Sequence, residues 1–130
     1  MDVVISDARI DQLIAEDVPY IDLTTQMLGI GDKPARIEFF TREDATVCAT
    51  EEAARVLQHL GAEVESLVPS GEQVAAGTIL LVAVGPAGAL HKAWKVCLNL
   101  LDRCSAVATK THILVSAAKS ANPACEVLTT

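Results

Sequence analysis

The chain has 130 residues, of which 51% are hydrophobic, and it carries a net charge of −7. This length suits one domain and is too short for a complete eight-stranded α/β barrel, which needs roughly 200 residues. The acidic balance, with neither a basic face nor stacking aromatic residues, argues against binding to nucleic acids or to anionic membranes. Because no apolar run could span a bilayer and no signal peptide is visible, we expect a cytoplasmic protein.

The N-terminal segment predicts a helix followed by an irregular stretch. Ser6 is a favourable N-cap, and Asp7 in the first turn complements the helix dipole. Val18 before Pro19 predicts the end of this helix, since a residue that precedes proline avoids the helical conformation. Residues 20–25 are rich in turn-forming and β-branched residues, so we do not expect the helix to continue through them.

The middle of the chain predicts strands around one helix. Alternating or continuous apolar residues predict strands at residues 35–41, 45–49, 62–68 and 79–84. Thr50 is expected to cap a helix that ends at Gly61, with Glu51 and Glu52 in its first turn. Acidic residues at that place usually pair with the helix dipole, so we do not assign them to catalysis. These elements form a compact α+β sandwich.

The last third of the chain predicts a long helix. Pro86 is a favourable first helical residue, and an Ala-rich helical pattern runs from it to about Ser120. The pattern allows a break near Ser105. Residues 126–130 then predict one more strand, which has nothing after it to pair with. A strand that opens a new unit and then stops indicates a truncated second domain.

The cysteines and histidines predict neither a disulfide nor a metal site. The cysteines match no CxxC spacing, so we expect free thiols in a reducing compartment. The histidines have no carboxylate or thiol at ligand spacing, so we expect no bound metal. The residues concerned are Cys48, Cys97, Cys104, Cys125, His59, His91 and His112.

Three stretches of the chain resemble the quinolinate phosphoribosyltransferases, also called nicotinate-nucleotide pyrophosphorylases. Residues 16–25 (E-D-V-P-Y-I-D-L-T-T) resemble the family's E-D-x-x-x-G-D-L-T-T, with Ile21 in place of glycine. Residues 71–85 resemble its G-x-x-V-x-x-G-x-x-L-x-x-x-x-G. Residues 98–109 (L-N-L-L-D-R-C-S-A-V-A-T) are similar to its L-N-x-x-x-x-x-S-G-I-A-T, with Ala106 in place of glycine. The wording E-D-V-P-Y, E-E-A-A-R and A-W-K-V favours the molybdenum-transport-associated branch, ModD.

The resemblance implies an N-terminal α/β sandwich joined to an incomplete α/β barrel in a homodimer, where each sandwich covers the partner's barrel. We accordingly expect the sandwich and its linking helix at residues 1–104 and the start of the truncated barrel at residues 105–130. The implied reaction of NAD biosynthesis converts a pyridine carboxylate and phosphoribosyl pyrophosphate to a mononucleotide and pyrophosphate. Mg²⁺ would accompany the phosphoribosyl pyrophosphate in the full-length protein, with none bound by this chain alone.

The resemblance places one substrate-binding residue within the chain. The family's arginine on the linking helix, which reaches into the partner subunit's site, aligns with Lys95. Without the resemblance, Lys95 is interpreted as a solvated helix lysine. Lysine keeps the positive charge but loses the bidentate recognition of carboxylates that arginine provides. The catalytic residues are expected beyond Thr130, so we predict that the 130-residue chain alone has no transferase activity.

The alternative hypothesis is a dimerisation or interaction module without catalysis of its own. Small and apolar residues line one face of the long predicted helix, and others lie around its sides. Such a helix needs a barrel or a second subunit to cover it. The face is formed by Ala93, Cys97, Leu101, Cys104 and Ala108, and the sides by Leu98, Val107 and Leu114.

Overall fold

The structure, a computed structural model, describes residues 5–19 and 21–129. Its helices are α1 (Asp7–Asp17), α2 (Leu23–Leu28), α3 (Thr50–His59) and α4 (Ala87–Ala121). Its strands are β1 (Pro34–Phe40), β2 (Ala45–Thr46), β3 (Glu63–Leu67), β4 (Gln73–Val74) and β5 (Ile79–Pro86). The predicted α+β class is confirmed. In the described ranges, no helix combines the length and apolarity needed to cross a membrane.

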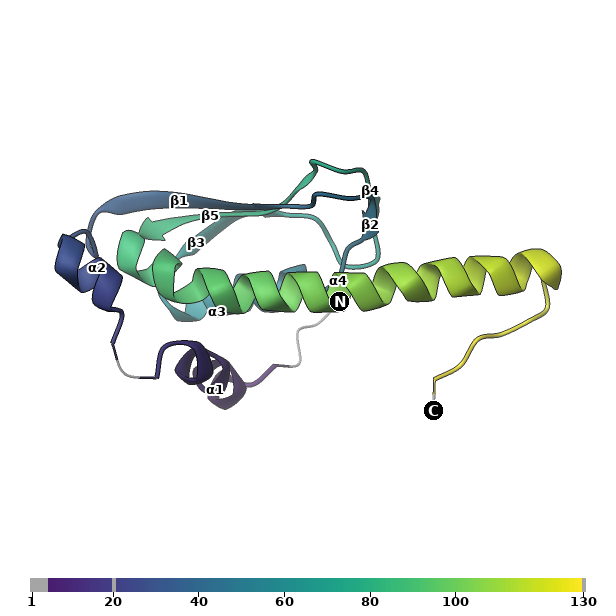
Figure 1. The fold of residues 1–130 in the computed structure, drawn as a ribbon, viewed down its shortest axis with the longest axis horizontal. Coiled ribbons are helices and arrows are strands. Elements are labelled where there is room, and N and C mark those ends of the chain that lie inside the picture. The colour runs from purple at the N-terminus through teal and green to yellow at the C-terminus, as the bar shows by residue number, and fades with distance from the viewer. Residues whose placement is uncertain (1–4, 20, 130) are drawn as a thin grey trace.

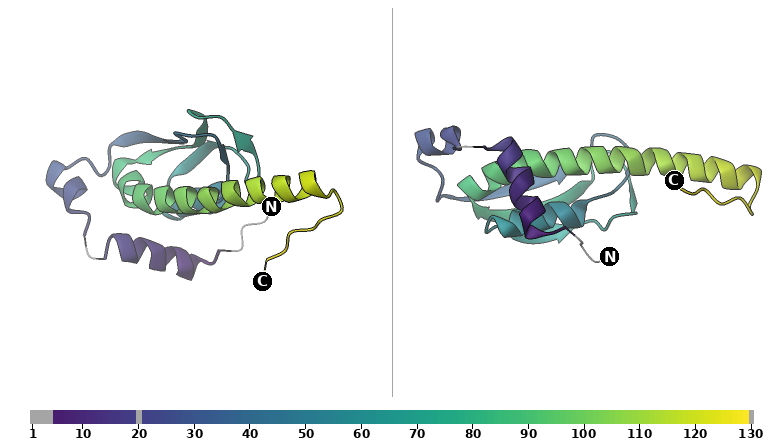
Figure 2. Two further views of the ribbon diagram at one scale, coloured as in Figure 1. Left: turned by 45° about the vertical axis from the view of Figure 1, so that its right-hand side comes forward. Right: turned by 90° about the horizontal axis from the view of Figure 1, so that it is seen from below.

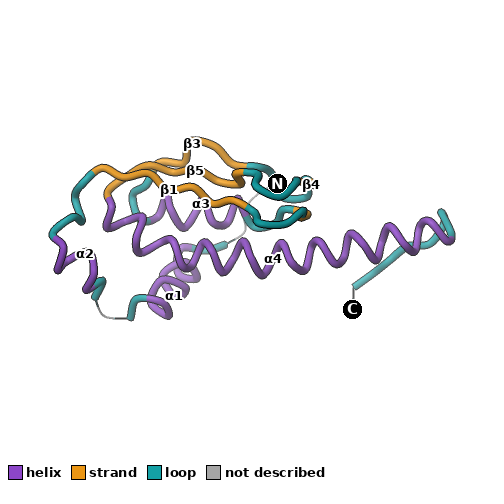
Figure 3. Tube along the Cα trace, turned by 45° about the horizontal axis from the view of Figure 1, so that its top comes forward, coloured by secondary structure: helices purple, strands orange, loops and turns teal. Residues whose placement is uncertain are grey.

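One antiparallel sheet carries the sandwich. Its strand order is β1-β5-β3, and β2 and β4 form a separate two-stranded ribbon at one end. The continuous apolar run of β5 fits its central place, since Leu80 to Ala83 are all buried. Helices α3 and α4 cover one face of the sheet, and α1 packs on these helices on the side away from the sheet (Figures 1 and 3).

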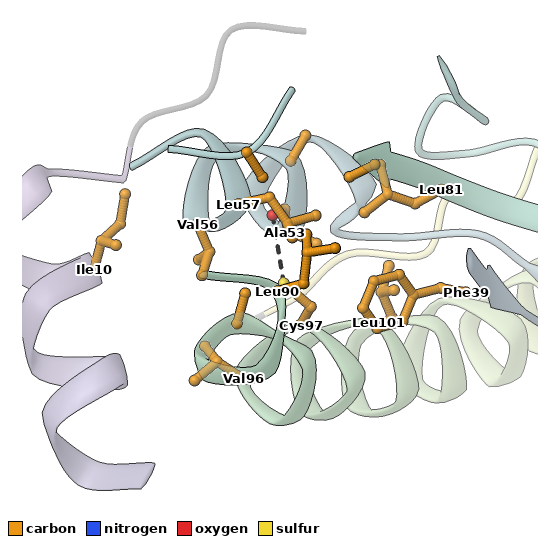
Figure 4. Packing of buried hydrophobic residues seen from close by; sticks show 14 residues of the cluster. Ile10, Phe39, Ala53, Val56, Leu57, Leu81, Leu90, Val96, Cys97 and Leu101 are labelled. Carbon is orange, nitrogen blue, oxygen red and sulfur yellow. Dashed lines mark hydrogen bonds between the residues drawn. The ribbon is translucent and has the colours of Figure 1, made fainter. Parts of the chain in front are cut away.

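The core lies where α3, α4 and the sheet meet (Figure 4). Leu57 of α3, Leu101 of α4 and Leu81 of β5 are at most 4% exposed. Cys97 of α4 is fully buried and its thiol donates to the Ala53 carbonyl at 3.5 Å. Burial raises the pKa of Cys97 to about 12, so this cysteine serves as a small apolar side chain.

Helix α4 continues without the break that the sequence allowed near Ser105. Ser105 is buried, and its hydroxyl accepts from the Cys48 N–H at 3.0 Å and donates to the Cys48 carbonyl at 3.3 Å. The Ser105 hydroxyl therefore provides a hydrogen-bond partner for the backbone N–H and carbonyl of Cys48, and it does not interrupt the helix.

Beyond Ser105, α4 still contacts the β2–β4 ribbon, where the Thr109 hydroxyl accepts from the Thr46 N–H and His112 lies 2.8 Å from the Gln73 amide. The last turns of α4 project past the strands (Figures 1 and 2). The expected domain boundary at residues 104 and 105 falls inside this continuous helix and stays a prediction.

Two helix starts differ from the predictions. Thr50 is the first residue of α3 rather than its cap, and its hydroxyl donates to the Val68 carbonyl at 2.7 Å. The Ser70 hydroxyl accepts from the Ala49 N–H, and Ser70 donates to Glu51 through its N–H and hydroxyl. Pro86 is the N-cap of α4, not its first residue, because it still pairs with β1 as the end of β5.

Two segments of the chain were mispredicted. Within residues 20–25, which we expected to be irregular, Leu23 begins helix α2, because Asp22 caps the Thr25 N–H at 3.3 Å. The strand predicted at residues 126–130 is absent from 126–129, and Thr130 lies outside the described residues. An isolated extended segment has no neighbouring strand to satisfy its backbone groups, so it does not form a strand.

Candidate functional site

Lys95 lies on the exposed side of α4. It forms no ion pair with any residue of the described ranges, and its Nζ lies 5.1 Å from the centroid of the adjacent Trp94 ring. This separation is within the range of a cation–π contact, which is weak at an exposed site. The Trp94 side chain is itself 39% exposed. The ammonium group is therefore placed at the surface, where it is accessible to an anion.

The D-L-T-T motif forms a tight local structure. The Asp22 carboxylate accepts from the Thr25 N–H at 3.3 Å and from the Thr25 hydroxyl at 2.5 Å. Thr25 is buried, and its methyl group packs between Gly31 and Gly88, where a Cβ on Gly31 would lie 3.2 Å from that methyl. The motif thus fixes α2 closely against the first turn of α4.

His91 extends this structure to α4. Its Nδ1 lies 2.9 Å from Oδ2 of Asp22, whose side chain is only 7% exposed. Burial disfavours the charged carboxylate, but the hydrogen bonds from Thr25 and His91 outweigh burial and lower the pKa of Asp22 below its usual value. The sequence analysis assigned no role to Asp22 or His91. An aspartate before a short apolar run was the available signal for the cap.

A cavity of about 530 Å³ adjoins this cluster. It opens among α1, α2 and the first turns of α4. Its polar lining comes from Asp22, Gln26, Asp32 and Lys92, and its apolar lining includes Ile14 and Leu60. The lining carries both charges, so the cavity by itself does not select one class of ligand.

A second, more open cavity of about 580 Å³ lies beside the middle of α4. Cys48 and Cys104 both line it, as do Arg103 and His112. Burial, together with Cys48 and Glu52, raises the pKa of the Cys104 thiol, so this thiol is a poor nucleophile at neutral pH. All four cysteines are free thiols in the structure.

No group of three or more histidine, cysteine, aspartate or glutamate side chains in the described ranges is arranged to hold a metal ion. The Asp22 carboxylate already accepts hydrogen bonds from Thr25 and His91. The residues present therefore do not fit a resident metal site.

Comparison with known proteins identifies the family. Residues 22–105 match the model of the quinolinate phosphoribosyl transferase N-terminal domain. The chain is 42% identical over 126 residues to the pyrophosphorylase ModD of Rhodobacter capsulatus. This alignment covers 97% of this chain and 49% of that protein. It is 38% identical over 125 residues to ModD of Pasteurella multocida, in an alignment that covers 96% of this chain and 44% of that protein.

Solved structures share the fold. NadC from Streptococcus pyogenes superposes with a TM-score of 0.81 at 20% identity, covering 90% of this chain and 44% of that chain. The nicotinate-nucleotide pyrophosphorylase from Ehrlichia chaffeensis superposes with a TM-score of 0.74 at 22% identity, covering 89% of this chain and 43% of that chain.

The chain spans less than half the length of these ModD relatives. The matched domain includes both the D-L-T-T motif and Lys95, so the two features described above lie within the region that defines the similarity. The chain belongs to the quinolinate phosphoribosyltransferase family, in which it represents the N-terminal domain and lies with the ModD branch.

Proposed function

We propose that the chain is the N-terminal part of a phosphoribosyltransferase that joins a pyridine carboxylate to phosphoribosyl pyrophosphate. The observation that carries this proposal is the match of residues 22–105 to the family's N-terminal domain. A relative from Synechocystis, 32% identical over 116 residues, is named as a carboxylating nicotinate-nucleotide pyrophosphorylase.

In the proposed carboxylating reaction, the ring nitrogen of quinolinate forms a bond to C1 of the ribosyl group. The bond from C1 to the pyrophosphate oxygen breaks, and its electron pair leaves with pyrophosphate. The 2-carboxylate then departs as CO₂, and a proton takes its place on the ring. Because positive charge develops on the ribosyl group between two polyanions, the site needs cationic side chains on the carboxylates and phosphates.

Lys95 is the cationic side chain that this chain would contribute. In the proposed homodimer it extends from α4 into the active site of the partner subunit and binds a substrate carboxylate. Its exposed position and its lack of an ion pair within the described residues support this role. A lysine provides a point charge, whereas a guanidinium can form two parallel hydrogen bonds to one carboxylate. The acceptor of this branch can therefore differ from quinolinate.

The proposal includes three features of the whole protein. Mg²⁺ would be bound with phosphoribosyl pyrophosphate, where it neutralises the charge of the departing pyrophosphate. Since the described residues do not fit a metal site, we assign none of them to Mg²⁺. The protein would act in the cytoplasm, and the similarity to ModD supports a link to molybdenum transport.

Steady-state kinetics of the full-length protein with quinolinate, phosphoribosyl pyrophosphate and Mg²⁺ tests the proposal. Lys95→Ala should raise KM for the carboxylate about tenfold or more, because it removes a charged hydrogen bond. Lys110→Ala, on an exposed lysine of the same helix, is the matched control and should leave KM unchanged. The 130-residue chain alone should show no turnover. Equal kinetics for Lys95→Ala and the control would contradict the role of Lys95.

The interaction module stays a second candidate because of the projecting half of α4. Val107, Ile113 and Leu114 are at least 60% exposed there, and such a stripe favours a covering partner. Sedimentation of the 130-residue chain tests this candidate: self-association at high concentration supports it, and a monomer at all concentrations contradicts it.

A further inference from the structure

Trp94 is a large apolar side chain that this domain leaves partly uncovered. It is the one tryptophan among the 130 residues, and it is 39% exposed on α4. Leu98, its neighbour one helical turn further along, is 40% exposed. A tryptophan beside a cation is typical of binding surfaces, because the ring provides a large apolar contact area once it is covered. The ring of Trp94 is therefore accessible to a ligand.

Trp94 and Lys95 lie close enough together to act on one ligand. Nζ of Lys95 is 5.1 Å from the centroid of the Trp94 ring. This cation–π contact is weak at an exposed site, so the ammonium can exchange it for a carboxylate. A carboxylate that lies about 2.8 Å from Nζ keeps the ring that carries it within reach of the indole. The two residues thus present a positive charge and a flat apolar face side by side.

The ring of the proposed acceptor changes its charge during the reaction. The lone pair of the ring nitrogen forms the bond to C1, and the electron pair of the broken C1–oxygen bond leaves with pyrophosphate. The ring thereby becomes a positively charged pyridinium. The face of an indole attracts a cation, and this attraction is stronger where water is excluded. An indole stacked on the ring would therefore stabilise the transition state more than the bound substrate, and such a difference raises the rate.

We propose that Trp94 is a second substrate contact, which stacks on the aromatic ring of the acceptor whose carboxylate is bound by Lys95. This inference rests on the proposed function, because it uses the same site in the partner subunit. It restricts the acceptor to planar nitrogen heterocycles that carry a carboxylate. Lys95 binds a charge that the substrate already has, whereas Trp94 stabilises the charge that appears as the new bond forms.

Two variants of Trp94 in the full-length protein separate the aromatic face from apolar bulk. Trp94→Leu keeps an apolar side chain but removes the aromatic face, and Trp94→Phe keeps a smaller aromatic face. With quinolinate, phosphoribosyl pyrophosphate and Mg²⁺, we expect Trp94→Leu to lower the single-turnover rate constant about tenfold, with KM within about threefold. Trp94→Phe should stay within about threefold in both values, and Lys95→Ala should act mainly on KM.

Phe40→Leu is the matched control for the loss of an aromatic side chain. Phe40 is 59% exposed and ends β1, whereas the start of β1 pairs with Pro86, the N-cap of α4. This variant should leave the rate constant and KM unchanged. A loss in Phe40→Leu equal to that in Trp94→Leu would overturn the specific role of Trp94.

Fluorescence tests the stacking directly. The difference in emission between the wild type and Trp94→Phe isolates Trp94 from any other tryptophan of the full-length protein. Nicotinate mononucleotide, the pyridinium product of the proposed reaction, should quench this difference, because a pyridinium ring in contact accepts an electron from the excited indole. An unchanged difference at a concentration that saturates the enzyme would overturn the contact.

Thermal unfolding and sedimentation check that every variant is folded and associated like the wild type. If Trp94→Leu is slow only because it has dissociated into monomers, Trp94 serves the subunit interface and the inference is wrong. If Lys95→Ala raises KM while both Trp94 variants react like the wild type, the inference fails and the proposed function stands. If none of the three variants changes the kinetics, the proposed site itself fails.

Discussion

The two halves of α4 differ in environment although they belong to one helix. The first half packs on α3 and the sheet, with Ala93, Cys97 and Leu101 at most 4% exposed. The second half contacts the β2–β4 ribbon, through Thr109 and His112, before it extends past the strands (Figure 1). Its Ile113 and Leu114 are 60% and 65% exposed. Apolar residues occur along both halves of α4, but the rest of this domain buries only those of the first half. The first half stabilises the sandwich, and the second half is available to another part of the protein or to a partner.

The largest expected effect comes from a matched pair of leucines in α4. Leu101→Ala should lower the free energy of unfolding by about 2–5 kcal/mol, because it leaves a cavity in the core. Leu114→Ala should change it by no more than about 0.5 kcal/mol, because this side chain is exposed in the isolated chain. Urea unfolding of both variants measures the difference. Similar losses for the two leucines would show that the second half is covered in solution.

A smaller effect should mark the boundary between the two halves. Ser105→Ala should lower the free energy of unfolding by about 1–2 kcal/mol, because the Cys48 N–H and carbonyl lose their partner in a buried place. Ser120→Ala is the control, since that hydroxyl bonds only to the Ser116 carbonyl within an exposed turn. If the two serine variants had equal stability by urea unfolding, the packing at Ser105 would be contradicted.

The pH dependence of stability tests the start of α3 in the packed region. Burial disfavours the charged carboxylate of Glu51, but hydrogen bonds from the Ser70 N–H and hydroxyl outweigh burial and lower the pKa of Glu51 below its usual 4.5. A lowered folded-state pKa means that this stabilisation is present above about pH 4.5 and is lost as pH falls below it. Glu51→Gln should therefore weaken the fall of stability below pH 4.5 and cost up to about 1 kcal/mol at pH 7. Urea unfolding at several pH values measures this. If the free energy of unfolding of Glu51→Gln fell below pH 4.5 as steeply as that of the wild type, the assignment would be wrong.

The smallest effect is expected at the far end of α4. Lys119 lies 3.5 Å from Glu126, and both side chains are well exposed. Lys119→Met should change the free energy of unfolding by less than about 0.5 kcal/mol, since exposed ion pairs are screened by water and salt. Urea unfolding at low and high salt checks this. A loss above 1 kcal/mol would indicate that the C-terminal segment is bound more firmly than the contact suggests.

Local signals predicted most of the elements and the Ser6 cap of α1, but not the N-caps of α2, α3 and α4. The alternation in residues 35–41 and the apolar run in 79–84 gave the two main strands, because a side chain's face depends on residue spacing alone. Thr50 looked like a cap, yet its hydroxyl donates to the Val68 carbonyl, which lies just after β3 and 18 residues further along the chain. The segment 126–129 had strand composition, but none of the described strands lies beside it to pair with it.

The candidate site was predictable only in part for a similar reason. The resemblance singled out Lys95, and the structure shows its surroundings without testing its role. The pairing of Asp22 with His91 was not predicted. The two residues lie 69 positions apart, and only the packing of α2 against α4 brings them together.

The sequence by itself determined the family, the α+β class and the long helix, because these depend on residue types and on spacings within single elements. Tertiary structure alone decided which half of α4 is buried, that Asp22 caps α2, and that this buried carboxylate orients His91. Each of those outcomes requires groups from different elements to meet, so their energies depend on packing and burial rather than on any local run of residues.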